Sequence, residues 1–134
     1  CLIQTVIDDS TGEELSFAMQ ALFKNGAKDV YFTPCFMKKN RPAYELSVMC
    51  DPEREEEMSR LVFTHTTAIG LRASLVHRRT MARSTVEKQT EFGPIKFKKC
   101  TYNAVTRLYP EYESLAQAAQ EHGVPLREIL DKIK

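Results

Sequence analysis

The stretch 30–44 changes from apolar to cationic and back to apolar, and this pattern constrains the fold more than any other feature. Its first half is rich in β-branched and aromatic residues and predicts a strand, and its end opens an apolar/polar alternation that predicts a second strand. The turn formers Asn40 and Pro42 lie between them, so the stretch predicts an antiparallel hairpin. Pro34 removes a hydrogen-bond donor from the first strand, which favours a position at the edge of a sheet or at a bulge.

The composition fits one globular domain. A chain of 134 residues with 43% hydrophobic and 28% charged residues is long enough to bury a core. No apolar run approaches the roughly 20 residues of a membrane span, so we expect no membrane partner. The four cysteines are widely spaced and form no Cys-x-x-Cys pair, which favours reduced thiols and a cytoplasmic protein. Because the chain begins with cysteine rather than methionine, we expect a piece of a longer protein.

The order of the predicted elements indicates the fold class. Around the hairpin, the sequence predicts a strand at 2–7, a helix that ends near Asn25, a helix that begins at Pro52 and a strand at 71–76. This order is the split βαβ arrangement of a ferredoxin-like α+β fold. The junction before the first helix holds two alternative capping boxes, namely Ser10 with Glu13 and Thr11 with Glu14.

The last third of the chain predicts an extra β-hairpin and a C-terminal helical hairpin. Its predicted elements are strands at 84–90 and 95–100 and helices that begin at Pro110 and Pro125. We therefore expect a ferredoxin-like core at 1–80 and, at 81–134, a hairpin and helical extension of the same domain. The apolar residues of the extension exceed what the core can absorb, so we expect the extension to contact a neighbouring subunit.

Three cations crowd into the turn of the central hairpin, where Lys38, Lys39 and Arg41 surround Asn40. Lysine acts as a point charge and arginine as a bidentate donor for phosphate oxygens, so the turn can hold phosphates. The alternative is a solvated hairpin tip.

Two adjacent acids, Asp8 and Asp9, follow the first strand directly. Carboxylate oxygens are suitable ligands for a hard divalent cation such as magnesium or manganese, which makes the pair a candidate metal site. The alternative is an Asx turn or a helix cap.

The bend that follows the second helix supplies hydroxyls and an arginine in a short span. Because the C-terminus of a helix is the negative end of its dipole, Thr66, Thr67 and loop amides would have to hold a phosphate there. We expect Arg72 to point out beside Thr66 and Thr67, and His65 to pack or to cap the helix.

A string of basic residues in the second half of the chain is compatible with nucleic-acid binding. However, aromatic residues are not interleaved with it and the net charge is only +1, so we expect no nucleic-acid partner. Phosphate-loop, serine-hydrolase and zinc-protease motifs do not occur in the chain. The basic residues are Arg72, Arg78, Arg79, Arg83, Lys96, Lys98 and Lys99.

Taken together, six motifs occur in an order that resembles the C-terminal domain of the LarC-type nickel insertion proteins. The resemblance covers essentially the whole chain, and the Met-Lys-Lys-x-Arg-Pro turn is its most specific motif. The motifs lie at 7–15, 26–34, 37–42, 66–72, 92–96 and 110–128, the last being marked at 110–113 and 121–128.

This resemblance implies a CTP-dependent cyclometallase, a nickel chelatase of the lyase class. The enzyme would insert Ni²⁺ into pyridinium-3,5-bisthiocarboxylic acid mononucleotide and make the nickel-pincer nucleotide cofactor of lactate racemase. The resemblance also implies that this domain binds CTP with Mn²⁺ or Mg²⁺, and that it forms a homo-oligomer, either a trimer or a hexamer. A separate N-terminal nickel-binding region would complete the full-length protein.

The chemistry of the residues agrees with a nucleotide site of this kind, because a triphosphate is neutralised by a hard dication together with lysine and arginine. The expected nucleotide-binding residues are Lys38, Lys39, Asn40, Arg41, Thr66, Thr67 and Arg72, and the expected metal ligands are Asp8 and Asp9. Nickel prefers soft or imidazole ligands, and the chain has only four scattered cysteines and three histidines, so we assign no nickel site and no catalytic residue. The alternative function is a non-catalytic nucleotide-binding oligomerisation or sensor module, since one fold hosts many functions.

Overall fold

The computed structural model describes residues 1–133. The chain forms two compact units, which we call the N-terminal unit (Cys1–His77) and the C-terminal unit (Arg78–Lys134). This division lies close to the boundary that we predicted after residue 80. The predicted mixture of helices and antiparallel strands is confirmed. No helix within residues 1–133 is long and apolar enough to cross a membrane.

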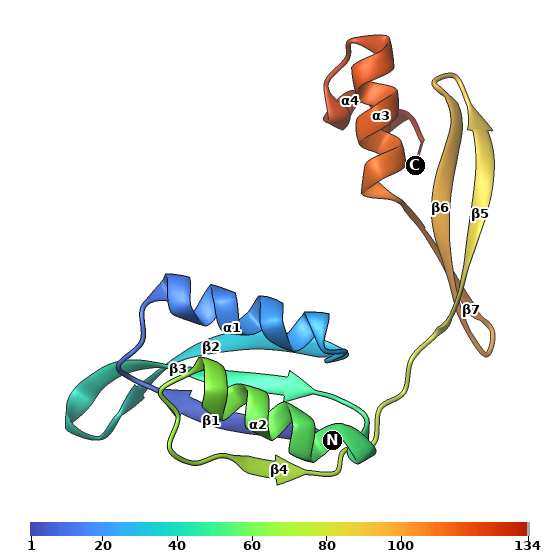
Figure 1. Ribbon diagram of the computed structural model, residues 1–134. Helices are drawn as coiled ribbons and strands as arrows, with labels where there is room; N and C mark the ends of the chain where they lie inside the picture. The colour runs from blue at the N-terminus through green and yellow to red at the C-terminus, as the bar shows by residue number, and fades with distance from the viewer. Residues whose placement is uncertain (134) are drawn as a thin grey trace. The chain divides into compact units, whose positions relative to one another are not determined.

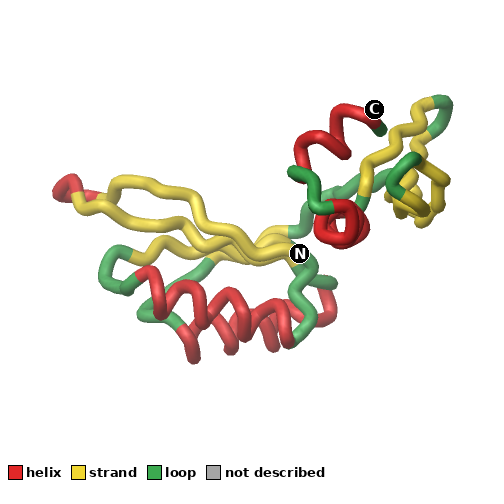
Figure 2. Tube along the Cα trace, turned by 90° about the horizontal axis from the view of Figure 1, so that it is seen from above, coloured by secondary structure: helices red, strands yellow, loops and turns green. Residues whose placement is uncertain are grey.

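The N-terminal unit packs two helices on one face of a four-stranded sheet, and the other face carries no helix of this unit (Figures 1 and 2). The order strand, helix, strand, strand, helix, strand is the predicted one. The elements are β1 (Leu2–Ile7), α1 (Gly12–Lys24), β2 (Asp29–Met37), the short 3₁₀ turn η1 (Lys38–Asn40), β3 (Arg41–Met49), the 3₁₀ turn η2 (Pro52–Arg54), α2 (Glu55–His65) and β4 (Arg72–Ser74).

The strands of this sheet have the order β2-β3-β1-β4, and all neighbours are antiparallel. Strand β2 is therefore an edge strand, which is the first of the two positions expected for Pro34, and its pairing with β3 runs through Pro34 without a bulge. Strand β4 has only three residues, so the predicted strand at 71–76 was too long. Pairing between β1 and β3 ends at Ile7 and Tyr44, whereas β2 and β3 stay paired as far as Met37 and Arg41. The end of the β2–β3 hairpin thus extends beyond the rest of the sheet.

The core of the N-terminal unit lies between the sheet and the helices. Strand β1 alternates partly exposed and buried residues, which is the period-two pattern of a strand with one face against a core. Ile3 and Leu46 on the sheet, Leu22 on α1 and Met58 on α2 are fully buried in this core. The opposite face of the sheet carries the partly exposed residues of β1, namely Leu2, Gln4 and Val6.

Helix α1 begins with a complete capping box at Thr11 and Glu14. The Glu14 backbone N–H donates to the Thr11 hydroxyl at 3.2 Å, and the Thr11 backbone N–H donates to the Glu14 carboxylate at 2.7 Å. The second of the two predicted boxes is therefore the one that forms, and Ser10 remains available for other contacts.

We expect Thr11→Ala to lower the free energy of unfolding of the N-terminal unit by about 1 kcal/mol, the usual cost of losing an N-cap side chain. Urea unfolding followed by circular dichroism measures this change. Ser10→Ala is the matched control, because its hydroxyl caps no helix N–H. A loss for Ser10→Ala equal to that for Thr11→Ala would contradict this assignment.

The C-terminal unit packs two helices against a three-stranded antiparallel sheet in the order β5-β6-β7. Its elements are β5 (Ala82–Thr90), β6 (Gly93–Tyr102), β7 (Val105–Pro110), α3 (Tyr112–His122) and α4 (Leu126–Lys132). We did not predict β7, and the helix expected to begin at Pro110 begins two residues later because Pro110 ends this strand. Gly123 ends α3 with φ of +63°, a backbone conformation that favours glycine.

The C-terminal unit has a hydrophobic core of its own. Ile95 and Phe97 on β6 are buried with Leu115 on α3 and Ile129 on α4. These are the apolar residues that we took as surplus to the core of the chain. They are not surplus, because the hairpin and the helices bury them against one another. Our reason for expecting the extension to contact a neighbouring subunit was therefore wrong.

Candidate functional site

The end of β1 lies beside the segment that precedes β4. The two strands are antiparallel, with Gln4 opposite Arg72, so the residues after Gln4 run alongside the residues before Arg72. The Thr5 hydroxyl accordingly donates to the Gly70 carbonyl at 2.6 Å. Two segments that are far apart in the sequence therefore meet at one edge of the N-terminal unit.

At this edge, a predicted metal ligand contacts a predicted phosphate-binding residue. The Thr67 hydroxyl donates to the Asp9 carboxylate, and its oxygen lies 3.1 Å from the Ser10 hydroxyl oxygen. All three side chains are polar and accessible at the surface. The cluster of Asp9, Ser10 and Thr67 thus offers only oxygen atoms to a ligand.

Asp8 contacts a different element, the cationic hairpin. Arg41 Nη1 lies 3.3 Å from Asp8 Oδ2, and the Arg41 and Asp8 side chains are 59% and 24% exposed. The hairpin reaches Asp8 because it extends beyond the last paired residue of β1. The predicted metal ligand Asp8 and the predicted phosphate ligand Arg41 therefore form an ion pair with each other.

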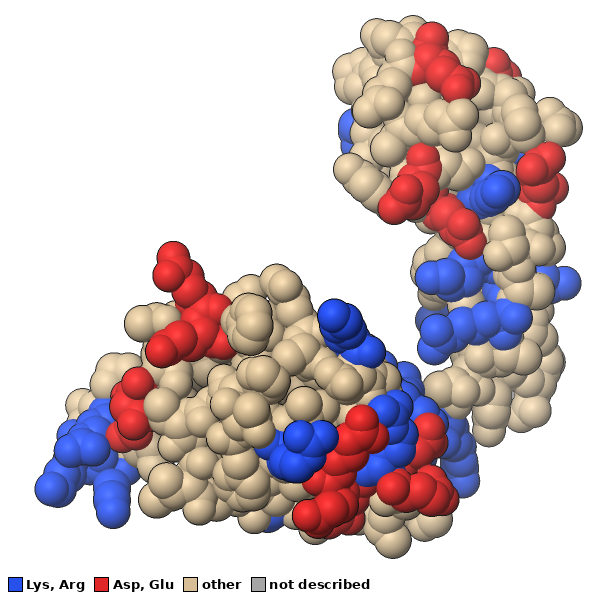
Figure 3. Space-filling view, in the orientation of Figure 1, with Lys and Arg blue, Asp and Glu red and all other residues tan. Residues whose placement is uncertain are grey.

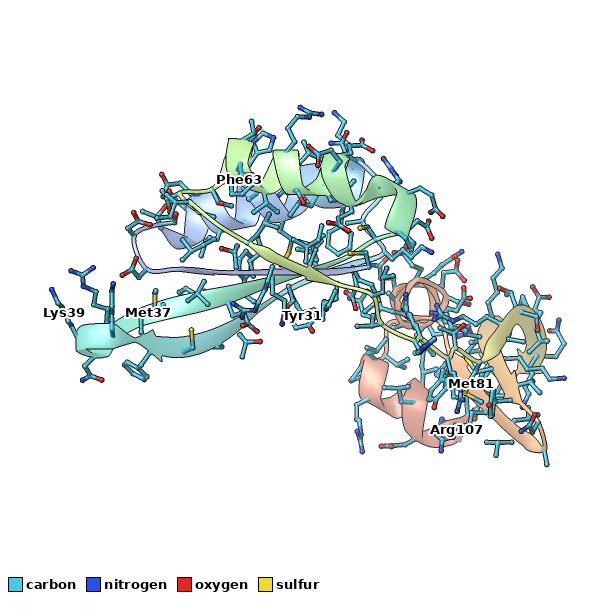
Figure 4. All side chains as sticks on the ribbon, turned by 90° about the horizontal axis from the view of Figure 1, so that it is seen from below. Tyr31, Met37, Lys39, Phe63, Met81 and Arg107 are labelled. Carbon is cyan, nitrogen blue, oxygen red and sulfur yellow. The ribbon has the colours of Figure 1, made fainter. Side chains whose placement is uncertain are left out.

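The tip of the hairpin presents its remaining cations to solvent. Figure 3 shows lysine and arginine side chains gathered at this tip, and Figure 4 shows Lys39 at its end. Lys39 and Asn40 have φ of +61° and +56°, a left-handed conformation that costs an ordinary residue about 1–2 kcal/mol. Within residues 1–133, neither Lys38 nor Lys39 has an ion-pair partner. Their charges are therefore available to an anion.

Thr66 has a different role from Thr67. Its hydroxyl donates to the Val62 carbonyl at 2.7 Å and accepts from the Ala68 backbone N–H at 3.2 Å. The Thr66 hydroxyl therefore caps the C-terminal end of α2, and its only proton is already donated to the Val62 carbonyl. Of the two threonines, Thr67 is the one whose side chain contacts Asp9. We call the end of β1 with Asp8 and Asp9 the acidic edge.

The structure does not place Arg72 where we expected it, beside Thr66 and Thr67. Arg72 Nη2 lies 2.5 Å from Glu45 Oε2, and Gln4 donates to the same carboxylate at 3.0 Å. Gln4 and Arg72 are cross-strand partners, so they share the face of the sheet that carries no helix. The side chain of Arg72 therefore lies on the face of the sheet that carries no helix, whereas Thr66 and Thr67 lie in the bend before β4.

A pocket of about 380 Å³ opens next to the acidic edge, between α1 and the end of α2. Its lining includes Ser10, Glu14, Phe17, His65 and Thr67. His65 packs against the Phe17 ring with 5.7 Å between the ring centres, which confirms that it packs. Sequence reasoning missed Phe17, although an aromatic residue outside the apolar stripe of α1 is a signal for such a role; its side chain is 64% exposed.

The residues at this edge fit a hard dication bound together with a nucleotide. No cluster of three or more His, Cys, Asp or Glu side chains suited to a metal occurs within the described chain. Mg²⁺ in nucleotide sites needs only one or two carboxylates, because phosphates and water complete its coordination. Asp8 and Asp9 would supply these two carboxylates and no soft donor, a donor set that suits Mg²⁺ or Mn²⁺ better than nickel.

A solved structure has the same fold over nearly the whole chain. It is described as LarC2, the C-terminal domain of a cyclometallase involved in the synthesis of the NPN cofactor of lactate racemase, in the apo form. The two match with a TM-score of 0.92 at 36% identity, over 98% of this chain and 92% of the other. A protein from Methanopyrus kandleri AV19 matches with a TM-score of 0.63 at 27% identity, over 96% of this chain and 80% of the other.

Curated relatives have similar sequences over the same span. A pyridinium-3,5-bisthiocarboxylic acid mononucleotide nickel insertion protein from Alkaliphilus metalliredigens is 40% identical over 99% of this chain and 32% of its own length. A protein of the same name from Acetivibrio thermocellus is 38% identical over 99% of this chain and 33% of its own length. The chain thus spans about a third of the length of these relatives.

The family model described as nickel insertion protein matches residues 1–130. Together with the LarC C-terminal domain structure, this match confirms the resemblance seen in the sequence motifs. The chain belongs to the nickel insertion protein family.

Proposed function

We propose that this chain is the CTP- and metal-binding domain of a nickel chelatase, a CTP-dependent cyclometallase of the lyase class. The full-length enzyme would insert Ni²⁺, as a substrate, into pyridinium-3,5-bisthiocarboxylic acid mononucleotide and so make the cofactor of lactate racemase. An N-terminal nickel-binding region would supply the nickel ligands, and the free thiols of all four cysteines support a cytoplasmic location.

The observation that carries the proposal is the meeting of two carboxylates with a cationic turn and a threonine hydroxyl at one edge of the sheet. Asp8 pairs with Arg41, and Asp9 pairs with Thr67. Asp8 and Asp9 would hold Mg²⁺ or Mn²⁺, which neutralises charge on the triphosphate when it is bound. Arg41 would hold phosphate oxygens with Lys38 and Lys39.

The Asp8–Arg41 pair suits such a site because it is easily exchanged. An exposed ion pair is worth about 0–1 kcal/mol, so little free energy is lost when the two side chains separate. Asp8 can then turn to the cation and Arg41 to a phosphate, and each charge gains an opposite partner. In the free protein, the pair keeps the charges of Asp8 and Arg41 neutralised.

We expect CTP to bind only weakly unless Mg²⁺ or Mn²⁺ is present, because the two carboxylates would repel the phosphates without a cation. Calorimetric titration with and without a chelator measures the difference. Asp9→Asn should weaken binding with metal and change it much less in metal-free buffer. Equal affinity in the two buffers would rule out the metal role. Asp29→Asn, which changes an exposed acid at the start of β2, is the control and should bind CTP like the wild type.

A second candidate function is a nucleotide-binding oligomerisation or sensor module without chemistry of its own. One fold hosts many functions, so the same CTP site would serve such a module equally well. Incubating the chain with CTP and Mn²⁺ separates the two functions. Release of CMP or CDP supports the enzyme, whereas binding with CTP left intact supports the module.

We also propose that the chain forms a symmetric homo-oligomer, a trimer or a hexamer. Support comes from large apolar side chains on the surface of the N-terminal unit, of which Phe36 on the extended hairpin is 73% exposed. Light scattering should then give a mass several times the chain mass of 15.4 kDa. A value near 15.4 kDa at tens of micromolar would contradict the oligomer.

A further inference from the structure

The C-terminal unit contains a second pocket of about 410 Å³, which no residue of the proposed CTP site lines. It lies at the end of the three-stranded sheet and is lined by Arg79, Thr80, Met81, Tyr102, Val105 and Arg107. We call it the arginine–tyrosine pocket. Its volume is in the range of small-molecule sites, which is about 300–1,000 Å³.

The register of the strands explains how the pocket is built. Tyr102 is opposite Val105, and Arg107 is two residues further along β7, opposite Cys100. Diagonal neighbours of this kind are about 7–8 Å apart, within reach of an arginine side chain. Met81 directly precedes β5, whose first pair joins Ala82 to Thr101, so the same register brings Met81 alongside Tyr102.

These residues lie on the face of the sheet that is turned away from the core of the C-terminal unit. Ile95 and Phe97 are buried against the helices. The pairing of β6 is regular from Phe97 to Tyr102, so the period of two places Tyr102 on the other face, which also carries the buried Cys100. Tyr102 is 46% exposed there. Figure 4 shows Arg107 in this sheet and Met81 just before its first strand. The ring of Tyr102 is thus accessible between two arginines.

The charge of the pocket is positive and unbalanced. Arg79 and Arg107 have no ion pair within residues 78–133, whereas Arg127 and Lys132 of the same unit are paired with acids. Cross-strand pairing adds Arg83 to the same face, because it is opposite Cys100. A larger pocket of about 460 Å³ at the start of α3 is lined by Glu111 and Glu113 with one cation, Lys96, so its charged lining is net negative and less suited to an anion. The arginine–tyrosine pocket is therefore the better anion site of this unit.

The proposed mononucleotide substrate has complementary chemistry. It combines a cationic aromatic ring with anionic thioacid groups and a phosphate. A cationic ring gains from contact with the face of a tyrosine, and arginine forms bidentate hydrogen bonds with carboxylate-like groups and with phosphate. Tyr102 between Arg79 and Arg107 offers these groups in one pocket.

Resting on the proposed function, we propose that the arginine–tyrosine pocket binds the pyridinium mononucleotide. The Tyr102 ring stacks on the pyridinium ring, and Arg79 and Arg107 bind its acidic groups and its phosphate. The substrate site and the CTP site are then built from different units of the chain.

The test uses nicotinic acid mononucleotide as the probe, because it carries a pyridinium ring, a carboxylate and a phosphate. NMR-detected titration of the whole chain should show binding, and Arg107→Ala and Arg79→Ala should each weaken it at least tenfold. Lys99→Ala, on the opposite face of β6, is the control and should bind like the wild type. Nicotinamide mononucleotide, which lacks the carboxylate, should bind more weakly than the acid.

Titration with CTP and Mg²⁺ on the same samples separates this inference from the proposed function. Unchanged CTP affinity in Arg107→Ala, together with lost mononucleotide binding, supports two separate sites. Wild-type NMR signals from the C-terminal core around Ile95, Leu115 and Ile129 show that the altered unit is still folded. If the wild type binds CTP but not the probe, or if both arginine variants bind the probe like the wild type, the pocket is not the substrate site. If CTP itself fails to bind, the proposed function is wrong.

Discussion

Replacing Arg41 with alanine should weaken the binding of CTP by about 2–5 kcal/mol in the presence of Mg²⁺, the range for truncating one member of a desolvated charge pair. In the free protein Arg41 is mostly exposed and pairs only with Asp8 among the described acids. Removing it therefore costs the fold little, and the melting temperature should barely change. A large loss of affinity with an unchanged melt is the pattern that identifies a binding residue.

Two other arginines make this experiment specific. Arg60→Ala on α2 removes a similar exposed charge from the same unit and should leave CTP affinity unchanged. Arg72→Ala should cost less than Arg41→Ala, because Arg72 is held by Glu45, which is four residues and thus about 13 Å along β3 from Arg41. Wild-type affinity for CTP in Arg41→Ala would mean that the hairpin tip is only solvated and does not bind the nucleotide.

The second large effect is expected in the core of the C-terminal unit. Ile129 is completely buried between α4 and the sheet, so Ile129→Ala should destabilise this unit by about 2–5 kcal/mol through lost burial and a cavity. Hydrogen exchange read residue by residue should show faster opening of β6 and α3. Amides of the N-terminal core should be unaffected, because that core contains none of the same residues.

A matched substitution checks that burial causes this effect. Ile69 is fully exposed in the N-terminal unit, and Ile69→Ala should change stability by less than about 0.5 kcal/mol. Similar losses for the two alanine variants would contradict burial as the cause of the effect.

Much of the N-terminal unit follows from local patterns. The hairpin is encoded by the change from apolar to cationic residues, and its edge position by Pro34. By contrast, β7 escaped prediction because its alternation is weak: all its residues except Pro110 are exposed, so no apolar face marks it as a strand. The C-terminal core escaped prediction because Ile95 and Ile129 are 34 positions apart, and only the folded chain shows that they meet.

The candidate site was predictable in its residue types and only partly in its geometry. Asp9 and Thr67 meet because the end of β1 and the start of β4 are at the same edge, a consequence of the predicted element order. The direction of Arg72 was not predictable, because it depends on the register in which β4, a strand of only three residues, pairs with β1 at Gln4. Thr66 differs from Thr67 only through the backbone at the end of α2.

The central claim is that Mg²⁺ and CTP bind at the edge formed by Asp8, Asp9, Arg41 and Thr67. Hydrogen–deuterium exchange of the chain with saturating CTP and Mg²⁺, compared with Mg²⁺ alone, tests it most directly. We predict protection in the peptides that cover residues 8–11, 38–41 and 66–70, and none from CTP in the presence of a chelator. Protection confined to the C-terminal unit, or no protection anywhere, would contradict the claim.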